Sequence, residues 1–274
     1  MTHRDQGDDG AEARRDQVWA RLATVMDPEL DESVTELNFV THADVDARNR
    51  VHIGFRLPTY WCAANFSYLM ADDMRRAVAA IDWVEGVKVT LGEHMYADKI
   101  NAGLAQGRSF QETFGEEADG DVEEVRRTFL LKAFQRRQYA ILNHLVATNY
   151  SSETLVAMTI AELEALDLDA EGNKLRQRYF DRLEVLGPVR PHAAAFLTSA
   201  AETLSSESLP KYLSGLRRVG VNAEFNGALC RGLLAVRFDL ETPLRSRSAS
   251  TAASVDAQLR PSRVHVESSE SLHG

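Results

Sequence analysis

Residues 51–66 read VHIGFRLPTYWCAANF and join a strand to a helix. Residues 51–57 alternate between apolar and other side chains, which is the period of a half-buried strand. From Phe66 an apolar stripe with helical spacing continues to Ile81. Cys62 therefore lies in the loop between strand and helix. Unpaired backbone N–H groups at a helix N-terminus favour the thiolate, the form that attacks electrophiles and binds soft metals.

The neighbouring segments complete a small domain. Residues 34–45 have β character, and a short polar loop separates them from the strand at 51–57, so an antiparallel hairpin is predicted. Residues 11–25 have the spacing of a helix, and residues 87–91 read as a third strand. The order helix, strand, strand, helix, strand predicts an α+β fold with one sheet face covered.

Beyond His94 the pattern becomes mainly helical. Helices are expected near residues 96–106, 122–147, 175–186, 192–204 and 210–220, and a last apolar run spans 227–238. Thr159 and Glu162 fit a capping box before a further short helix. The sequence thus predicts a disordered leader (1–10), an α+β domain (11–95), a helical region (96–240) and a disordered Ser/Arg-rich tail (241–274).

The composition and net charge of the chain argue against several classes of protein. Hydrophobic residues make up 44% and charged residues 26%, which are ordinary globular values. The net charge of −10 argues against general nucleic-acid binding. No run of about 20 apolar residues is present, and the polar start lacks the apolar core of a signal peptide. With two cysteines in the chain, we expect a cytoplasmic protein without a disulfide framework and without membrane association.

Asp27, Pro28 and Glu29 end the first helix. Taken alone, this motif reads as turn chemistry. It is followed by a strand with Leu37 and Val40, and later by Thr59 and Cys62 in the loop.

With these motifs in order, residues of about 15–93 resemble the small domain of the PaaD/SufT-like iron–sulfur assembly family. That family is implicated in maturing iron–sulfur or other iron proteins, with the loop cysteine as its best functional candidate. The resemblance assigns this role to Cys62. It also carries Asp27 and Glu29 over as motif positions, either as acids near a metal or as structural residues.

The loop departs from the family pattern. Members usually have Gly before and Pro after the cysteine, whereas this chain has Trp61 and Ala63. Having Trp61 and Ala63 in place of Gly and Pro changes the flexibility of the loop and the way in which the following helix begins. Trp61 either shields the thiol or presents a docking surface.

Further side chains are candidates for the same site. His94 follows the third strand, and a Cys/His pair with a carboxylate would make an open iron or zinc site, although a histidine beside a strand end is commonly a surface residue. Cys230 reads as a packing residue, with a two-cysteine site as the alternative. The basic residues from Arg126 to Arg137 are interpreted as a solvated helix face, or otherwise as a docking face for an acidic partner.

The sequence predicts a chaperone-like maturation factor for iron–sulfur cluster assembly. It would deliver iron or a transiently held iron–sulfur cluster to a client metalloprotein. Extended proteins that look like this one are associated with bacterial multicomponent oxygenases, so a di-iron oxygenase component is the favoured client. The alternative is a metal-free adaptor that binds its client through Trp61 and the helical region.

The familiar hydrolase, zinc-protease and dinucleotide motifs are absent from the sequence, so an enzyme is not predicted. A Cys62 nucleophile with His94 as its base is a third hypothesis. Homo-oligomerisation and the role of the helical extension stay open.

Overall fold

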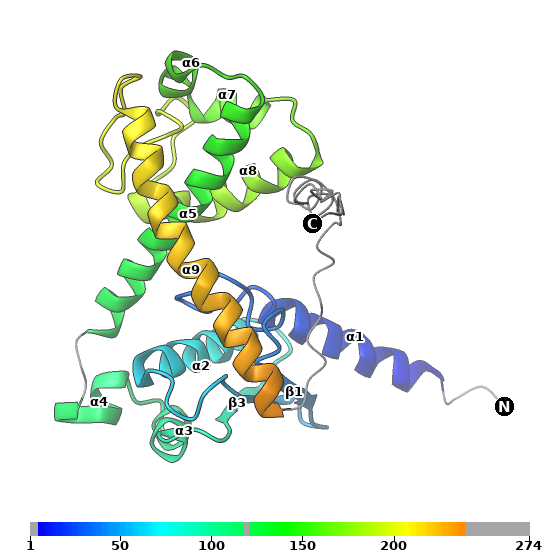
Figure 1. The fold of residues 1–274 in the computed structure, drawn as a ribbon. Helices are drawn as coiled ribbons and strands as arrows, with labels where there is room; N and C mark the ends of the chain where they lie inside the picture. Colours follow the sequence, from blue (N-terminus) through cyan, green and yellow to red (C-terminus); the bar gives the residue numbers. More distant parts are fainter. Residues whose placement is uncertain (1–4, 118–120, 239–274) are drawn as a thin grey trace, which may run out of the picture. The chain divides into compact units, whose positions relative to one another are not determined.

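The computed structural model describes residues 5–117 and 121–238, and Figure 1 shows their helices and strands. The predicted tail at 241–274 and the first four residues of the predicted leader lie outside the described residues. The order of elements confirms the predicted α+β class, because a helix and a three-stranded sheet come first and a mainly helical region follows.

Helix α1 (Asp5–Leu22) begins earlier than the sequence predicts, so residues 5–10 of the predicted disordered leader are helical. These residues are polar and lack an apolar period, so the pattern gave no signal for the extra turns. Val18 and Leu22 are fully buried and hold the helix on the core.

The first strand is shorter than predicted. Residues 34–38 form turns, and β1 comprises Val40–Val45. Asp31 and Asn38 have φ angles of +53° and +58°, which an extended strand does not contain. Val34 and Leu37 are both buried at a spacing of three, which suits a turn better than an alternating strand. Packing in the core therefore overrides the β propensity of this segment.

The sheet has the order β1-β2-β3. β1 and β2 (Arg50–Phe55) pair antiparallel, which confirms the predicted hairpin. Asp46 closes the hairpin loop by accepting hydrogen bonds from the backbone N–H groups of Arg48 and Arg50. β3 (Gly86–Leu91) runs parallel to β2, and α2 (Ala64–Ala79) makes the crossover between them. The central strand, β2, thus leads directly into the Cys62 loop.

The first hydrophobic core lies between the sheet and helices α1 and α2. Met74 and Val78 of α2 belong to the same buried cluster as Ile53 of β2 and Leu91 of β3. Leu234, near the end of α9 (Leu209–Phe238), belongs to this cluster too. The last helix therefore contributes to the core of the N-terminal domain.

The remaining helices follow in chain order. They are α3 (Ala97–Ala105), α4 (Phe110–Phe114), α5 (Val122–Ala147), α6 (Ser152–Ala157), α7 (Ile160–Ala165) and α8 (Ala170–Leu183), with 3-10 turns η1 (Gly115–Glu117) and η2 (Glu184–Leu186). α5 has the predicted bounds, and Thr159 and Glu162 form the predicted capping box at the start of α7. A second core includes Phe134 of α5 and Tyr179 of α8.

In the last third of the chain, one predicted helix is absent and another extends beyond its predicted end. Residues 192–204 form turns and isolated bridges, with Ala195 and Phe196 buried in the second core. Residues 209–238 form one continuous helix, α9, where the sequence predicts a helix that ends near Gly220 and a separate apolar run. A glycine in a helix costs about 1 kcal/mol relative to alanine. Packing of Leu216 in the second core and Leu234 in the first offsets that cost.

Among the described residues, no helix is both long and apolar enough to cross a membrane.

Candidate functional site

Cys62 occupies the position that the sequence predicts, between β2 and the first residue of α2. Its side chain is half-buried, and its thiol lies 3.1 Å from the hydroxyl of Thr59 in a hydrogen bond. Leu57, at the start of the loop, is buried in the first core and fixes the loop on the domain. The thiol is therefore held in place while part of it stays accessible.

His94 lies against the Cys62 loop and is 5% exposed. Its Nε2 donates a hydrogen bond of 2.8 Å to the carbonyl oxygen of Cys62, and its Nδ1 accepts one of 3.2 Å from the backbone N–H of Tyr96. Burial lowers the pKa of His94, the bond to the Cys62 carbonyl opposes this, and nearby Arg237 adds to the lowering. The imidazole is thus neutral with its proton on Nε2, and both nitrogens hold backbone groups rather than the thiol.

The Asp27 turn is a second part of the site. Asp27 Oδ1 accepts hydrogen bonds from the backbone N–H groups of Glu29 and Leu30, which folds the acidic motif into a tight turn. Burial raises the pKa of Asp27 to about 6, even though both hydrogen bonds act in the opposite direction. Glu29 points toward α9, where its Oε1 accepts a hydrogen bond of 2.9 Å from Asn226.

Cys230 of α9 lies near the predicted site residues, a proximity that spacing in the sequence does not reveal. Its side chain is half-buried and packs against the first core, as does Cys62. Burial raises the pKa of Cys230 to about 11, and negative charge at Asp27, Cys62 and Glu29 contributes to the increase. The structure thus brings Cys62 and both motif acids within electrostatic range of Cys230.

The inner face of α9 is fastened to the turn and loop that carry these residues. Arg231 forms an ion pair of 2.7 Å with Glu32. Arg237 donates hydrogen bonds of 3.2 Å to the carbonyl of Leu57 and 2.6 Å to that of Glu93. Neither arginine stands out in the sequence, because the partners are more than 140 residues away along the chain.

Helix α5 holds the same turn from another side. Arg137 makes hydrogen bonds of 2.6 Å and 2.8 Å to the two carboxylate oxygens of Asp31, and both side chains are 5% exposed. Arg136 donates a hydrogen bond of 2.7 Å to the carbonyl of Glu29. The prediction of a solvated basic face is therefore wrong for these two residues. The basic residues of α5 instead neutralise and position an acidic turn inside the molecule.

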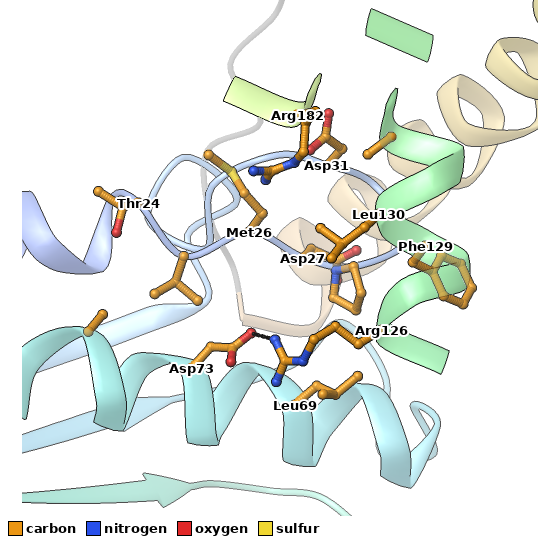
Figure 2. A pocket seen from close by; sticks show the side chains of 14 residues that line it. Thr24, Met26, Asp27, Asp31, Leu69, Asp73, Arg126, Phe129, Leu130 and Arg182 are labelled. Carbon is orange, nitrogen blue, oxygen red and sulfur yellow. Dashed lines mark hydrogen bonds and ion pairs between the residues drawn. The ribbon is translucent and has the colours of Figure 1, made fainter. Parts of the chain in front are cut away.

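A cavity of about 320 Å³ lies beside this turn and contains Asp27 in its wall. Figure 2 shows Asp73 of α2 paired with Arg126 of α5, at 2.7 Å, near the apolar side chains of Leu69 and Phe129. Arg182 of α8 also reaches the cavity and pairs with Asp31 at 3.4 Å. Most of the charged groups in the wall thus have partners within the protein.

His94 contacts the Cys62 loop, and Asp27 and Glu29 share the acidic turn, but these four predicted ligands do not converge as a metal site. Among the described residues, no group of three or more His, Cys, Asp or Glu side chains is arranged to hold a metal ion. For Glu29 or His94 to act as a ligand, each would first release its present partner. The ligand roles of Cys62, His94, Asp27 and Glu29 stay predictions.

An apolar patch surrounds the Cys62 loop. Tyr60, Trp61 and Met95 are exposed, and Trp61 is 71% exposed. The backbone N–H of Met95 donates a hydrogen bond of 2.9 Å to the carbonyl of Tyr60, so the two segments of the patch are joined. Because most of Trp61 faces solvent, the geometry favours a docking surface over a shield for the thiol.

Comparison with known proteins shows which family the N-terminal segment resembles. Residues 15–91 match the profile of a family described as iron-sulfur cluster assembly protein. A solved structure, a domain of unknown function (DUF59) from Bacillus anthracis, is 20% identical with a TM-score of 0.29, and the match covers 36% of this chain and 97% of that one. The search of curated proteins found no match. The predicted resemblance to the PaaD/SufT-like iron–sulfur assembly family is thereby confirmed for the N-terminal segment of the chain.

Proposed function

We propose that this protein is a maturation factor that delivers iron or an iron–sulfur cluster to a client protein, with Cys62 as the transient ligand or transfer thiol. The family match over residues 15–91 supports a general role in cluster assembly. The placement of Cys62 carries the specific proposal, since the thiol is held by Thr59 in a fixed loop beside exposed Trp61.

The chemistry of the cargo explains why binding would be transient. Iron–sulfur clusters are commonly held by four cysteine thiolates, and the loop supplies one. The remaining ligands of a cluster would come from the client or from other groups near the loop. Cargo held by so few protein ligands leaves readily, which suits a delivery step.

The client in this proposal is a metalloprotein, and a bacterial di-iron oxygenase component is our favoured candidate. This choice depends on the family-level association of similar extended proteins. The helical extension supports a dedicated client, because α5 and α9 both contact the turn beside the proposed transfer thiol.

The test is anaerobic reconstitution with ferrous iron and sulfide, followed by measurement of bound iron and acid-labile sulfide. We expect wild type to bind iron and Cys62→Ala to fall to background, whereas Cys230→Ala, the matched single-thiol control, retains most of it. Equal iron in wild type and Cys62→Ala would contradict the transfer role of Cys62.

A second candidate function is a metal-free adaptor that binds the client. It is favoured by the exposed patch of Tyr60, Trp61 and Met95 and by the engagement of both His94 nitrogens. An adaptor predicts no bound iron in wild type after reconstitution. It also predicts that Trp61→Ala weakens binding to a co-expressed di-iron hydroxylase, whereas Cys62→Ser leaves both binding and hydroxylase iron unchanged.

A further inference from the structure

The outer face of α9 carries a long exposed apolar stripe. Its members are large side chains that are 39–86% exposed, namely Val221, Phe225, Leu229, Leu233 and Val236. Their spacings of four, four, four and three residues place them on one side of a helix. A contiguous exposed apolar surface on a folded protein marks an interaction site more often than a solitary apolar residue does.

This stripe is not needed to hold α9 in place. Asn226, Arg231 and Arg237 make the polar contacts to the N-terminal domain, and Leu234 enters its core. The outer face is thus available for a separate task.

The shape of the stripe fits another helix. Ala228 is exposed beside Leu229, and a Cβ atom built at Gly232 would have open space around it. These small residues make a shallow row next to the larger side chains, as in the ridges and grooves through which helices pack.

The charge around the stripe indicates the character of that helix. Arg217 and Arg218 are exposed at its N-terminal end, and within the described part of the chain neither has an ion-pair or hydrogen-bond partner. Lys211 is exposed near the same end of α9, and the only acidic residue of this helix is Glu224. Pairing α9 with the same helix of a second copy would bring two basic surfaces together, which costs free energy.

We propose that the outer face of α9 is a docking site for an amphipathic helix that is apolar on one side and acidic on its flanks. Identifying this helix as part of the client rests on the proposed function, whereas the surface and its chemistry do not. The opposite side of α9 contacts Glu29 and the carbonyl of Leu57, so a helix bound here would bring its protein close to the Cys62 loop.

The test uses three labelled synthetic peptides of 18 residues and the full-length chain. One has leucines at helical spacing with glutamates elsewhere. The second has the same leucines with lysines, and the third is a shuffled version of the first without the apolar period. We expect fluorescence anisotropy at pH 7 to show the glutamate peptide binding at least tenfold more tightly than either of the others.

Variants of the chain test the surface itself. We expect Leu229→Asp to weaken binding of the glutamate peptide at least tenfold, because it places a charge in the centre of the stripe. Arg217→Glu combined with Arg218→Glu should reverse the preference toward the lysine peptide. Val189→Asp, at another exposed apolar residue that is not part of α9, is the matched control and should bind as wild type does. Circular dichroism checks that each variant keeps its helix content.

Three results would overturn the proposal: no binding of the glutamate peptide by wild type, equal binding of the glutamate and lysine peptides, or unchanged binding by Leu229→Asp. Sedimentation of wild type as a dimer that Leu229→Asp dissociates would assign the stripe to a second copy instead. Because the peptide assay contains no iron, its outcome is independent of whether Cys62 carries cargo.

Discussion

Arg137 and Asp31 show how single residues connect the two parts of the protein. The guanidinium lies on α5, the carboxylate lies in the turn after α1, and both side chains are 5% exposed. Arg178 and Arg182 of α8 lie within 4.0 Å of the same carboxylate, at 3.9 Å and 3.4 Å. A buried carboxylate with this many cationic partners fixes the acidic turn relative to the helices.

We predict that Arg137→Ala lowers the free energy of unfolding by about 3 kcal/mol, because it removes both short hydrogen bonds to the buried carboxylate of Asp31. Arg178 and Arg182, at 3.9 Å and 3.4 Å, compensate the remaining charge only in part. Urea denaturation would measure the loss. Arg126→Ala is the comparison, since the Arg126–Asp73 pair is 25% and 29% exposed and should cost about 1 kcal/mol or less. A loss for Arg137→Ala no larger than that for Arg126→Ala would contradict the prediction.

Asp27 predicts a pH dependence of stability. Its pKa is about 6 in the folded protein and 3.8 ordinarily, because burial disfavours the charged form. Between these two values the unfolded chain releases the proton while the folded protein retains it. The contribution of Asp27 to the free energy of unfolding therefore falls as the pH rises through this window, and it stays low above it.

We expect Asp27→Asn to remove this dependence, because an amide does not ionise and its oxygen can still accept the two backbone hydrogen bonds. Relative to wild type, the variant should gain roughly 2–3 kcal/mol between pH 4 and pH 7. Urea unfolding at several pH values measures the difference. Asp46→Asn should change in the opposite direction and at more acidic pH, around and below the ordinary value of 3.8, because hydrogen bonds from the backbone and side chain of Arg50 lower the pKa of Asp46. A difference for Asp27→Asn that is constant with pH would refute the assignment.

At the scale of the elements, α9 packs against the N-terminal domain and is held there by polar contacts. Asn226, Arg231 and Arg237 attach it to the acidic turn and to the Cys62 loop, and Cys230 lies between Asn226 and Arg231 along the helix. The burial of Cys230 therefore reports whether this half of the helix stays in place.

We predict that Cys230 is slow to alkylate. With a pKa of about 11 in place of 9.0, about a hundredth as much thiolate is present at pH 8. In the Cys62→Ala background, iodoacetamide should react with Cys230 about a hundredfold more slowly in buffer than in urea. Arg231→Ala should raise the rate in buffer, since it removes the ion pair to Glu32. Equal rates in buffer and urea would show that α9 does not cover Cys230.

At the scale of the molecule, the described residues form one compact unit with two hydrophobic cores. α9 contributes Leu216 to one core and Leu234 to the other, and α5 carries both Phe134 and the arginine that binds Asp31. Loosening one core therefore disturbs contacts of the other.

We expect calorimetry of the full-length protein to show a single cooperative unfolding transition for this unit. Arg137→Ala should broaden or split the transition, because it weakens the connection between the cores. Two well-separated transitions in wild type would mean that the domain and the helical region unfold independently.

The sequence by itself determined the elements whose signals are local. Alternation predicts the hairpin at β1 and β2, helical spacing predicts α2 and α5, and a capping box predicts the start of α7. The alternation and the helical spacing together place Cys62 at the junction of β2 and α2, and the structure has it there. Each of these depends on neighbours within a few residues, which a sequence displays directly.

Only the tertiary structure decided those features that depend on contacts between residues far apart in the sequence. The turns at residues 34–38, the unbroken path of α9 through Gly220 and the burial of Arg137 each contradict a local pattern. Cys230 reaches the neighbourhood of Cys62 in the same way. In every case the deciding energy comes from packing or charge contributed by residues far along the chain, and such contacts exist only once the fold has formed.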